Sequence, residues 1–154
     1  MSNIFDASSI PSYLDAIKHQ KVVFTNGCFD LLHPGHLYYL NEAKELGDIL
    51  IVGLNSDHSV RQIKGNNRPI NDEHFRAEML IGLKPVDAVV LFDEDTPIQI
   101  ISIIKPAIHV KGGDYNITKL PEYETVVSNG GEVKLLSFLD GYSSTNIINK
   151  LINN

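Results

Sequence analysis

Short apolar runs alternate with longer amphipathic segments along this chain, and that alternation limits its fold more than any other feature. The apolar runs fall at residues 21–25, 48–54, 88–92, 108–111 and 132–138. Because most of them lack the in-out alternation of a half-exposed sheet, we expect strands that are covered on both faces. The amphipathic segments predict helices at residues 11–20, 34–46, 72–83 and 97–104, and a last helix that ends near residue 152. Strands and helices in alternation predict a parallel, doubly wound α/β sheet.

The length and the helix start signals complete this outline. A chain of 154 residues that is 43% hydrophobic suits one ordinary domain rather than two. Residues 1–20 are predicted to form an N-terminal helical extension ahead of a main domain at residues 21–154. Thr96 is expected to be the N-cap of the helix that begins at Pro97, and Ser143 or Ser144 can cap the final helix.

The charge balance argues against one large class of partner. Thirteen Lys and Arg against nineteen Asp and Glu give a formal net charge of −6, and the basic residues are scattered. This pattern is not typical of proteins that bind nucleic acid. An acidic protein can still bind an anionic small molecule where a few cations and backbone N–H groups gather at one place. A binding site must therefore be sought in local motifs.

Cysteine usage and the N-terminal sequence indicate a cellular compartment. Cys28 is the only cysteine, which excludes an intramolecular disulfide and a Cys-rich zinc site and fits a reducing compartment. The first residues, MSNIFDASSI, lack the basic start and apolar run of a secretory signal. No apolar stretch approaches the roughly 20 residues of a membrane span. We therefore expect a cytoplasmic protein with no membrane partner.

The loops that follow the predicted strands are the places to look for a site, because ligands of doubly wound sheets bind beyond the carboxyl ends of the strands. These loops lie at residues 26–36, 55–71, 112–116 and 140–145. The first of these loops forms the last part of the string FTNGCFDLLHPGH. We expect the chain to turn at Gly27 and then to enter a helix that carries His33 and His36 on one face. Gly35 would let a ligand approach the backbone at the positive end of the helix dipole. The pair suits a phosphate, although two surface histidines would show the same spacing.

The whole string carries more information than the two histidines. It resembles the HxGH signature, in the form G-x-F-D-x-x-H-x-G-H, of the cytidylyltransferase-like nucleotidyltransferases, which have a Rossmann-like α/β fold. The resemblance extends over about residues 21–152, through NSD at 55–57, RPIN at 68–71, KGGDY at 111–115 and DGYSSTNII at 140–148. Within that family, KGGDY and the late Ser/Thr segment look most like the D-glycero-β-D-manno-heptose 1-phosphate adenylyltransferases. Those enzymes supply ADP-activated heptose for lipopolysaccharide and related glycans.

The resemblance implies two stretches that bind the nucleotide. The first would contact the phosphates through Cys28, Phe29, His33, Gly35 and His36. The second would donate to phosphate at a helix N-terminus and comprises Gly141, Tyr142, Ser143, Ser144 and Thr145. A plain helix cap would place serine there equally well. This stretch departs from the D-G-C-S-T-T that is common in the group, because Tyr142 and Ser144 stand where Cys and Thr are usual.

The resemblance also implies residues that bind the second substrate. Lys64 and Arg68 lie in a polar, Gly-containing loop that could close over a charged substrate, and solvated loop charges are the alternative. The remaining candidates are Lys111 and Asp114 in KGGDY, and Asp30, which could contact the substrate or only hold its loop. Arg76 is expected to form a structural ion pair at least as readily as to take part in catalysis.

The implied reaction needs no dedicated base. A sugar 1-phosphate has a second pKa of about 6, so its ionised oxygen can attack the α-phosphorus of ATP directly and release pyrophosphate. Positioning and charge neutralisation would come from helix N-termini, from Mg²⁺ carried by the nucleotide, and from the catalytic candidates His33, His36, Lys64 and Arg68. No protein metal site is predicted, because the other histidines fall at no ligand spacing. We also expect a homodimer, and a separate sugar kinase that supplies the phosphosugar.

Other functions remain open from sequence alone. The same platform serves cytidylyltransferases for glycerol 3-phosphate or another polyol phosphate, and FMN adenylyltransferases. A nucleotide-binding module without turnover is a candidate of another class. A flavodoxin-like or NAD-binding domain has no support, since no G-x-G-x-x-G follows the first predicted strand.

Overall fold

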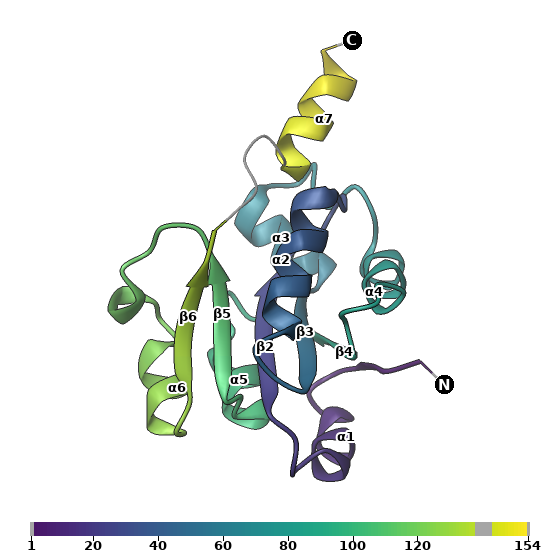
Figure 1. Cartoon of the computed structure of the whole chain (residues 1–154). Helices are drawn as coiled ribbons and strands as arrows, with labels where there is room; N and C mark the ends of the chain where they lie inside the picture. The colour runs from purple at the N-terminus through teal and green to yellow at the C-terminus, as the bar shows by residue number, and fades with distance from the viewer. Residues whose placement is uncertain (1, 138–142, 154) are drawn as a thin grey trace.

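Six parallel strands form one sheet at the centre of the molecule (Figure 1). The computed structural model describes residues 2–137 and 143–153. The strands are β1 (Ile4–Phe5), β2 (Val22–Gly27), β3 (Ile49–Asn55), β4 (Ala88–Phe92), β5 (Ile108–Gly112) and β6 (Glu132–Leu136). They are ordered β1-β4-β3-β2-β5-β6. The predicted parallel α/β architecture is therefore confirmed.

Helices cover both faces of this sheet (Figure 1). They are α1 (Ile10–Ala16), α2 (Pro34–Lys44), α3 (Asp57–Lys64), α4 (Glu73–Ile81), α5 (Ile98–Ile104), α6 (Tyr123–Ser128) and α7 (Ser144–Ile152), with a short 3₁₀ turn, η1 (Ile117–Lys119). Helices α2 and α4 pack their buried residues against one face of the sheet. Helices α1, α5 and α6 pack against the other. No helix in the described part of the chain is both long and apolar enough to cross a membrane.

The sequence interpretation missed several short or polar elements. Strand β1 has two residues and pairs in parallel with β4, in a region where only helix was expected. Helix α3 lies inside the predicted loop 55–71, and its start is fixed by Ser56, whose side chain accepts from the Ser59 N–H. Helix α6 and η1 were also not predicted. At α5 the N-cap is Pro97 rather than Thr96, so that prediction was wrong by one residue.

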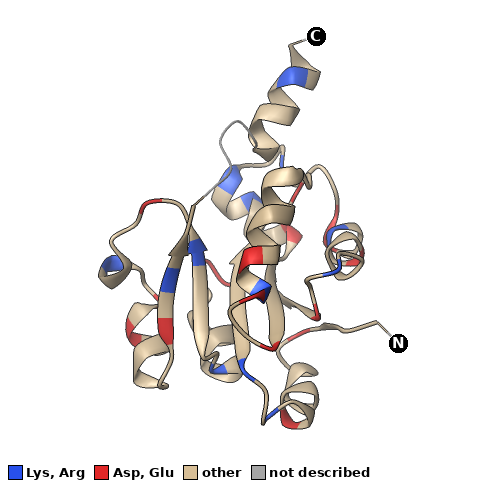
Figure 2. Ribbon diagram, viewed as in Figure 1, with Lys and Arg blue, Asp and Glu red and all other residues tan. Residues whose placement is uncertain are grey.

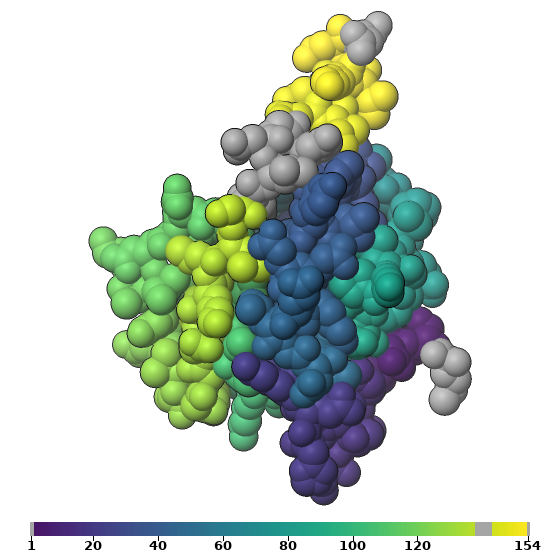
Figure 3. Space-filling model, viewed as in Figure 1, coloured from purple at the N-terminus to yellow at the C-terminus, as the bar shows by residue number. Residues whose placement is uncertain are grey.

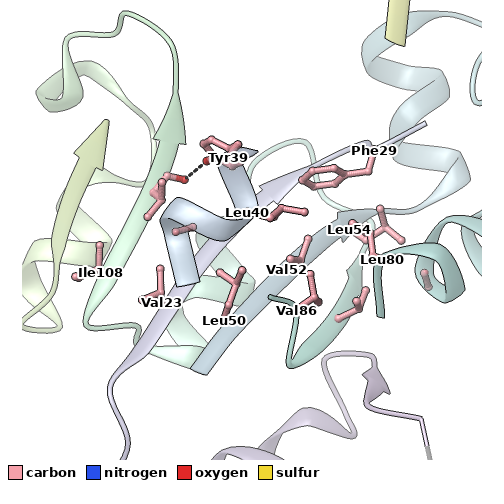
Figure 4. Packing of buried hydrophobic residues seen from close by; sticks show 14 residues of the cluster. Val23, Phe29, Tyr39, Leu40, Leu50, Val52, Leu54, Leu80, Val86 and Ile108 are labelled. Carbon is pink, nitrogen blue, oxygen red and sulfur yellow. Dashed lines mark hydrogen bonds between the residues drawn. The ribbon is translucent and has the colours of Figure 1, made fainter. Parts of the chain in front are cut away.

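Strand order reverses between β2 and β5. The chain runs from β2 through β3 and β4 on one side of the sheet, and then crosses to β5 on the other side of β2. Tyr39 of α2 ties the two strands together, because its hydroxyl lies 2.7 Å from the Thr25 hydroxyl and donates to the Val110 carbonyl at 3.1 Å. Figure 4 shows this bond at the edge of the core beneath α2. The carboxyl ends of β2 and β5 are therefore held side by side.

Helix α7 stands apart from the rest of the domain. It rises above the carboxyl ends of the strands and points away from the sheet (Figures 1 and 3). None of its residues is buried, and Leu151 and Ile152 are 73% and 74% exposed. Its first turn nevertheless reaches the loop before α2, since the Ser144 hydroxyl donates to the Leu31 carbonyl at 2.6 Å. The start of α7 is thereby placed at the same sheet edge as the other loops.

Candidate functional site

A cavity of about 660 Å³ opens at the point where strand order reverses. Its walls come from the ends of β2 and β5, from the starts of α2 and α7, and from the end of α3. The lining residues that the sequence had singled out are Cys28, Phe29, Asp30, His33, Gly35, His36, Lys64, Arg68, Lys111, Ser143, Ser144 and Thr145. The other lining residues are Asn26, Gly27, Tyr39, Ile63, Gly112 and Tyr115. The volume suits a small-molecule ligand.

Two candidates do not join this group. Asp114 is exposed and does not line the cavity, although it shares the KGGDY motif with Lys111. Arg76 is almost completely buried and does not line the cavity either. Gly141 and Tyr142 lie outside the described residues.

The two histidines stack on each other at the start of α2. Their ring centroids are 3.8 Å apart with an interplanar angle of 24°. His36 Nδ1 accepts a hydrogen bond from the His33 backbone N–H at 3.3 Å. In the neutral ring the proton must therefore sit on Nε2, which makes His36 Nε2 a donor. A fixed donor beside a helix N-terminus is suited to a phosphate oxygen.

Burial favours the neutral form of both rings. Burial lowers the pKa of His36 to about 4, and the nearby His33 and Lys64 contribute in the same direction. Burial also lowers the pKa of His33. A bound phosphate would oppose these effects, because a negative charge nearby favours the protonated ring.

The loop between β2 and the histidines turns at a different residue from the one predicted. Gly27 is the last residue of β2, and the left-handed backbone is found at Phe29, with φ of 47°. The Phe29 ring folds back over Gly27, where an added Cβ would lie 3.0 Å from the ring. Glycine at this position therefore leaves room for the ring, and a larger residue would require the ring to shift by a few tenths of an ångström. The Phe29 ring also reaches His36, with centroids 5.2 Å apart.

Asp30 holds two loops together. Its buried carboxylate accepts from Arg68 Nε at 2.7 Å and from the backbone N–H groups of Ile70 and Asn71 at 2.9 and 3.0 Å. Burial alone would raise the pKa of this carboxyl, but these bonds outweigh it and hold the pKa below the usual value. The contacts match the loop-holding role that was one of its two expected roles. Arg68 keeps a donor for a ligand, since its Nη2 is buried with no hydrogen-bond partner among the described residues.

Arg76 is the central scaffold residue beneath the site. Its Nη1 donates to the carbonyl oxygens of Cys28 and Asn55 at 2.7 and 2.8 Å. Its Nη2 donates to the Asp57 carboxylate at 2.8 Å, and its Nε donates to the Asn71 carbonyl at 2.9 Å. These bonds join the loops after β2 and β3 to the start of α4. The structural ion pair considered for this residue is present.

Three cations line the cavity of this acidic chain. Lys64 is the last residue of α3, so it is anchored on a helix rather than carried by the predicted loop. Arg68 follows in the loop after α3, and Lys111 lies near the end of β5. Figure 2 shows Lys and Arg on α3 and at the upper end of β5, at the carboxyl edge of the sheet. The local gathering of cations that an anion site requires is therefore present.

Two of the three hydroxyl side chains at the start of α7 are bonded within the protein. The Ser143 side chain is the N-cap and accepts from the Asn146 N–H at 2.9 Å. The Ser144 hydroxyl is bonded to the backbone of Leu31. The cap role that the sequence allowed is therefore present at Ser143, and Thr145 lines the cavity together with the two serines.

Asn26 and Glu122 are functional candidates that the sequence interpretation missed. Asn26 Oδ1 is buried at the cavity wall without a hydrogen-bond partner among the described residues. Glu122, only 2% exposed, lies 3.7 Å from the Lys111 ammonium. Neither residue belongs to a motif. Asn26 could still have been found, because it lies at the end of the first long strand, where ligands of doubly wound sheets bind. Within the described chain, no group of three His, Cys, Asp or Glu residues is placed to hold a metal ion.

Several known proteins are similar to this chain in sequence or in structure. A family model described as cytidylyltransferase-like matches residues 24–150. Bifunctional protein HldE of Geobacter metallireducens is 55% identical over 133 residues, 86% of this chain and 27% of that protein. Bifunctional protein HldE of Campylobacter fetus is 57% identical over 130 residues, 84% of this chain and 28% of that protein. This chain therefore spans less than a third of the length of these curated relatives.

A solved structure extends the comparison. It is the lipopolysaccharide core biosynthesis protein from Thermoplasma volcanium, with a TM-score of 0.65 and 32% sequence identity. The similarity covers 80% of this chain and 99% of that one.

Proposed function

Because this chain belongs to the cytidylyltransferase-like family, we propose that it transfers AMP from ATP to a sugar 1-phosphate, with heptose 1-phosphate as the acceptor. Membership, which confirms the resemblance of the HxGH string, makes the chain a nucleotidyltransferase. The choice of ATP as the donor and heptose 1-phosphate as the acceptor is the more specific part of the proposal. It rests on the KGGDY motif and on the similarity to HldE proteins and to a lipopolysaccharide core biosynthesis protein.

One observation carries the proposal: the stacked histidines at the start of α2 face the same cavity as Lys64, Arg68 and Lys111. A triphosphate needs donors and cations within one small volume, and this is the place in a doubly wound sheet where nucleotides bind. A site that only bound an uncharged ligand would not need this set of donors.

The proposed chemistry is a direct displacement. An ionised oxygen of the sugar 1-phosphate attacks the α-phosphorus of ATP, a new P–O bond forms, and the bond from the α-phosphorus to the bridging oxygen breaks. Pyrophosphate leaves with that oxygen, and the product is ADP-heptose. His36 Nε2–H and Arg68 Nη2 are available to donate to phosphate oxygens as the charge shifts. We propose that Mg²⁺ enters with ATP as part of the substrate.

The lengths of the relatives indicate how many of their functions the proposal covers. The HldE proteins are named bifunctional, and this chain matches less than a third of each. The proposal therefore concerns one of two functions. We propose that a sugar kinase makes the acceptor sugar 1-phosphate, and that the chain acts as a cytoplasmic homodimer.

The test is pyrophosphate release in the presence of Mg²⁺. ATP and CTP are each offered with heptose 1-phosphate, in both anomers, and with glycerol 3-phosphate. We expect release only with ATP and heptose 1-phosphate. The variants His33→Ala and His36→Ala should lose on the order of 10²-fold or more in turnover. His74→Ala, which changes an exposed histidine of α4, is the matched control and should retain activity.

Other outcomes would change the assignment. Release with CTP and glycerol 3-phosphate would keep the site and overturn the substrate. No pyrophosphate release with any pair would refute transfer to a sugar phosphate. FMN would then be the next acceptor to test, and after it a binding role without turnover.

A further inference from the structure

A buried polar cluster lies behind the wall of the cavity, beneath Lys111. It consists of His109 on β5 and Glu122 at the start of α6, which are 0% and 2% exposed. His109 Nε2 lies 3.3 Å from Glu122 Oε1, and the Lys111 ammonium lies 3.7 Å from the same oxygen. Neither His109 nor Glu122 lines the cavity. The cluster therefore reaches a ligand only through Lys111.

The hydrogen bonds indicate how charge is distributed in this cluster. His109 Nδ1 lies 3.3 Å from the Phe24 carbonyl, which can only accept, and Nε2 faces the Glu122 carboxyl. Burial alone would raise the pKa of Glu122, but the bond from His109 and the charges of Lys111 and His109 hold it below the usual value. Nε2 of the His109 ring can donate to the Glu122 carboxylate when it carries the ring proton.

This distribution has a consequence for Lys111. The same carboxylate oxygen of Glu122 is contacted by the His109 ring and by the Lys111 ammonium. The carboxylate therefore restrains the position of the Lys111 ammonium. Since removal of charges from water is costly, a buried pair of this kind is not explained by packing alone.

The sheet register shows which part of the cavity Lys111 serves. Strands β2 and β5 pair with Phe24 opposite His109, so Asn26 and Lys111 come next on the same face. Helix α2 packs on the opposite face, where Val23 contacts its core residues. Lys111 and Asn26, whose Oδ1 has no hydrogen-bond partner in the described part of the chain, therefore flank a part of the cavity that the histidines do not. It offers a cation for a phosphate and an acceptor for a hydroxyl group.

We propose that Glu122, supported by His109, is a positioning residue that holds the Lys111 ammonium at the cavity wall to bind the phosphate of the acceptor sugar. This inference rests on the proposed adenylyl transfer. It adds two buried residues, outside every sequence motif, that determine the affinity for the acceptor.

The test is a double-mutant cycle with steady-state kinetics for both substrates. Lys111→Met and Glu122→Gln should each raise KM for heptose 1-phosphate on the order of 10-fold and leave KM for ATP nearly unchanged. The double variant should resemble Lys111→Met alone, because Glu122 acts through Lys111. Glu132→Gln is the control, since Glu132 forms a similar 3.8 Å pair with Lys134 but is exposed on β6. Effects that multiply, or an equal rise in both KM values, would overturn the positioning role.

A second measurement does not depend on turnover. Isothermal titration calorimetry should show that Glu122→Gln binds heptose 1-phosphate about 10-fold more weakly than the original protein, whereas Glu132→Gln should bind it equally well. Equal affinities of Glu122→Gln and the original protein would overturn the positioning role. If the protein releases no pyrophosphate with any acceptor but Glu122→Gln still binds heptose 1-phosphate more weakly, the proposed function fails while the positioning role stands.

Discussion

Replacement of Arg76 by methionine tests whether one buried guanidinium holds the floor of the site. The change preserves much of the side-chain volume but removes every donor from a side chain that is 0% exposed. It breaks the pair with Asp57, and it leaves the carbonyl oxygens of Cys28, Asn55 and Asn71 without these bonds.

The expected cost follows from these partners. Removal of one member of a buried ion pair typically costs about 3–5 kcal/mol, and each buried carbonyl left unsatisfied costs about 1–3 kcal/mol. The sum overstates the loss, because loops can relax and Asp57 is partly exposed, so we expect a fall of at least about 4 kcal/mol in the free energy of unfolding. For a chain of this size that is a fall in Tm of at least about 10 °C.

Thermal and urea unfolding, followed by circular dichroism, measure the change. Arg61→Met is the matched control, because Arg61 is exposed on α3 and should stay within about 0.5 kcal/mol of the original protein. Arg76→Lys should fall between the two, since a lysine keeps a positive charge near Asp57 but cannot reach all four acceptors. Equal Tm values for Arg76→Met and Arg61→Met would refute the scaffold role.

Three further predictions concern the loops around the cavity. Because the pKa of His36 is about 4 in the folded protein, the unfolded state binds more protons, and the free energy of unfolding should fall as the pH drops from 6.5 towards 4, by at most about 3 kcal/mol. Urea titrations at pH 7 and pH 5 should show a smaller fall for His36→Gln than for the original protein. An equal fall in the two proteins would contradict the assignment to His36. Ser144→Ala should free the start of α7 from Leu31 and speed proteolytic cleavage near residue 143, with Tm lowered by only a few degrees. Gly27→Ala should displace the Phe29 ring and raise KM for ATP, whereas unchanged kinetics would show that the ring moves freely.

Local signals predicted the parts of the molecule that depend on neighbours in sequence. Strands β3 and β4 are almost entirely apolar, and His33, Gly35 and His36 lie within one helical turn. Both features can be recognised in the sequence, because each depends on residues that are close together along the chain. The end of the first long strand and the start of α2 could therefore be predicted as a candidate phosphate site from the sequence.

Features that depend on strand pairing could not be found in this way. Strand β1 is recognised only through its pairing with β4, and α3 has a polar sequence that favoured a loop. Glu122 approaches Lys111 because the residue that begins α6 lies against His109 and Lys111 of β5, and α6 was itself not predicted. Asn26 gains its significance from the register that sets it beside Lys111.

The charges around the cavity explain how an acidic chain can bind a triphosphate without a basic patch. Arg68 is paired with Asp30, Lys111 shares Glu122 with His109, and the pKa of His36 is held at about 4. Among the described cations of the cavity wall, only Lys64 has no ion pair. A phosphate that enters favours protonation of the stacked histidines, so part of the positive charge arises only when the ligand is present. The site therefore needs few permanent cations, which is why neither the net charge nor the distribution of basic residues revealed it.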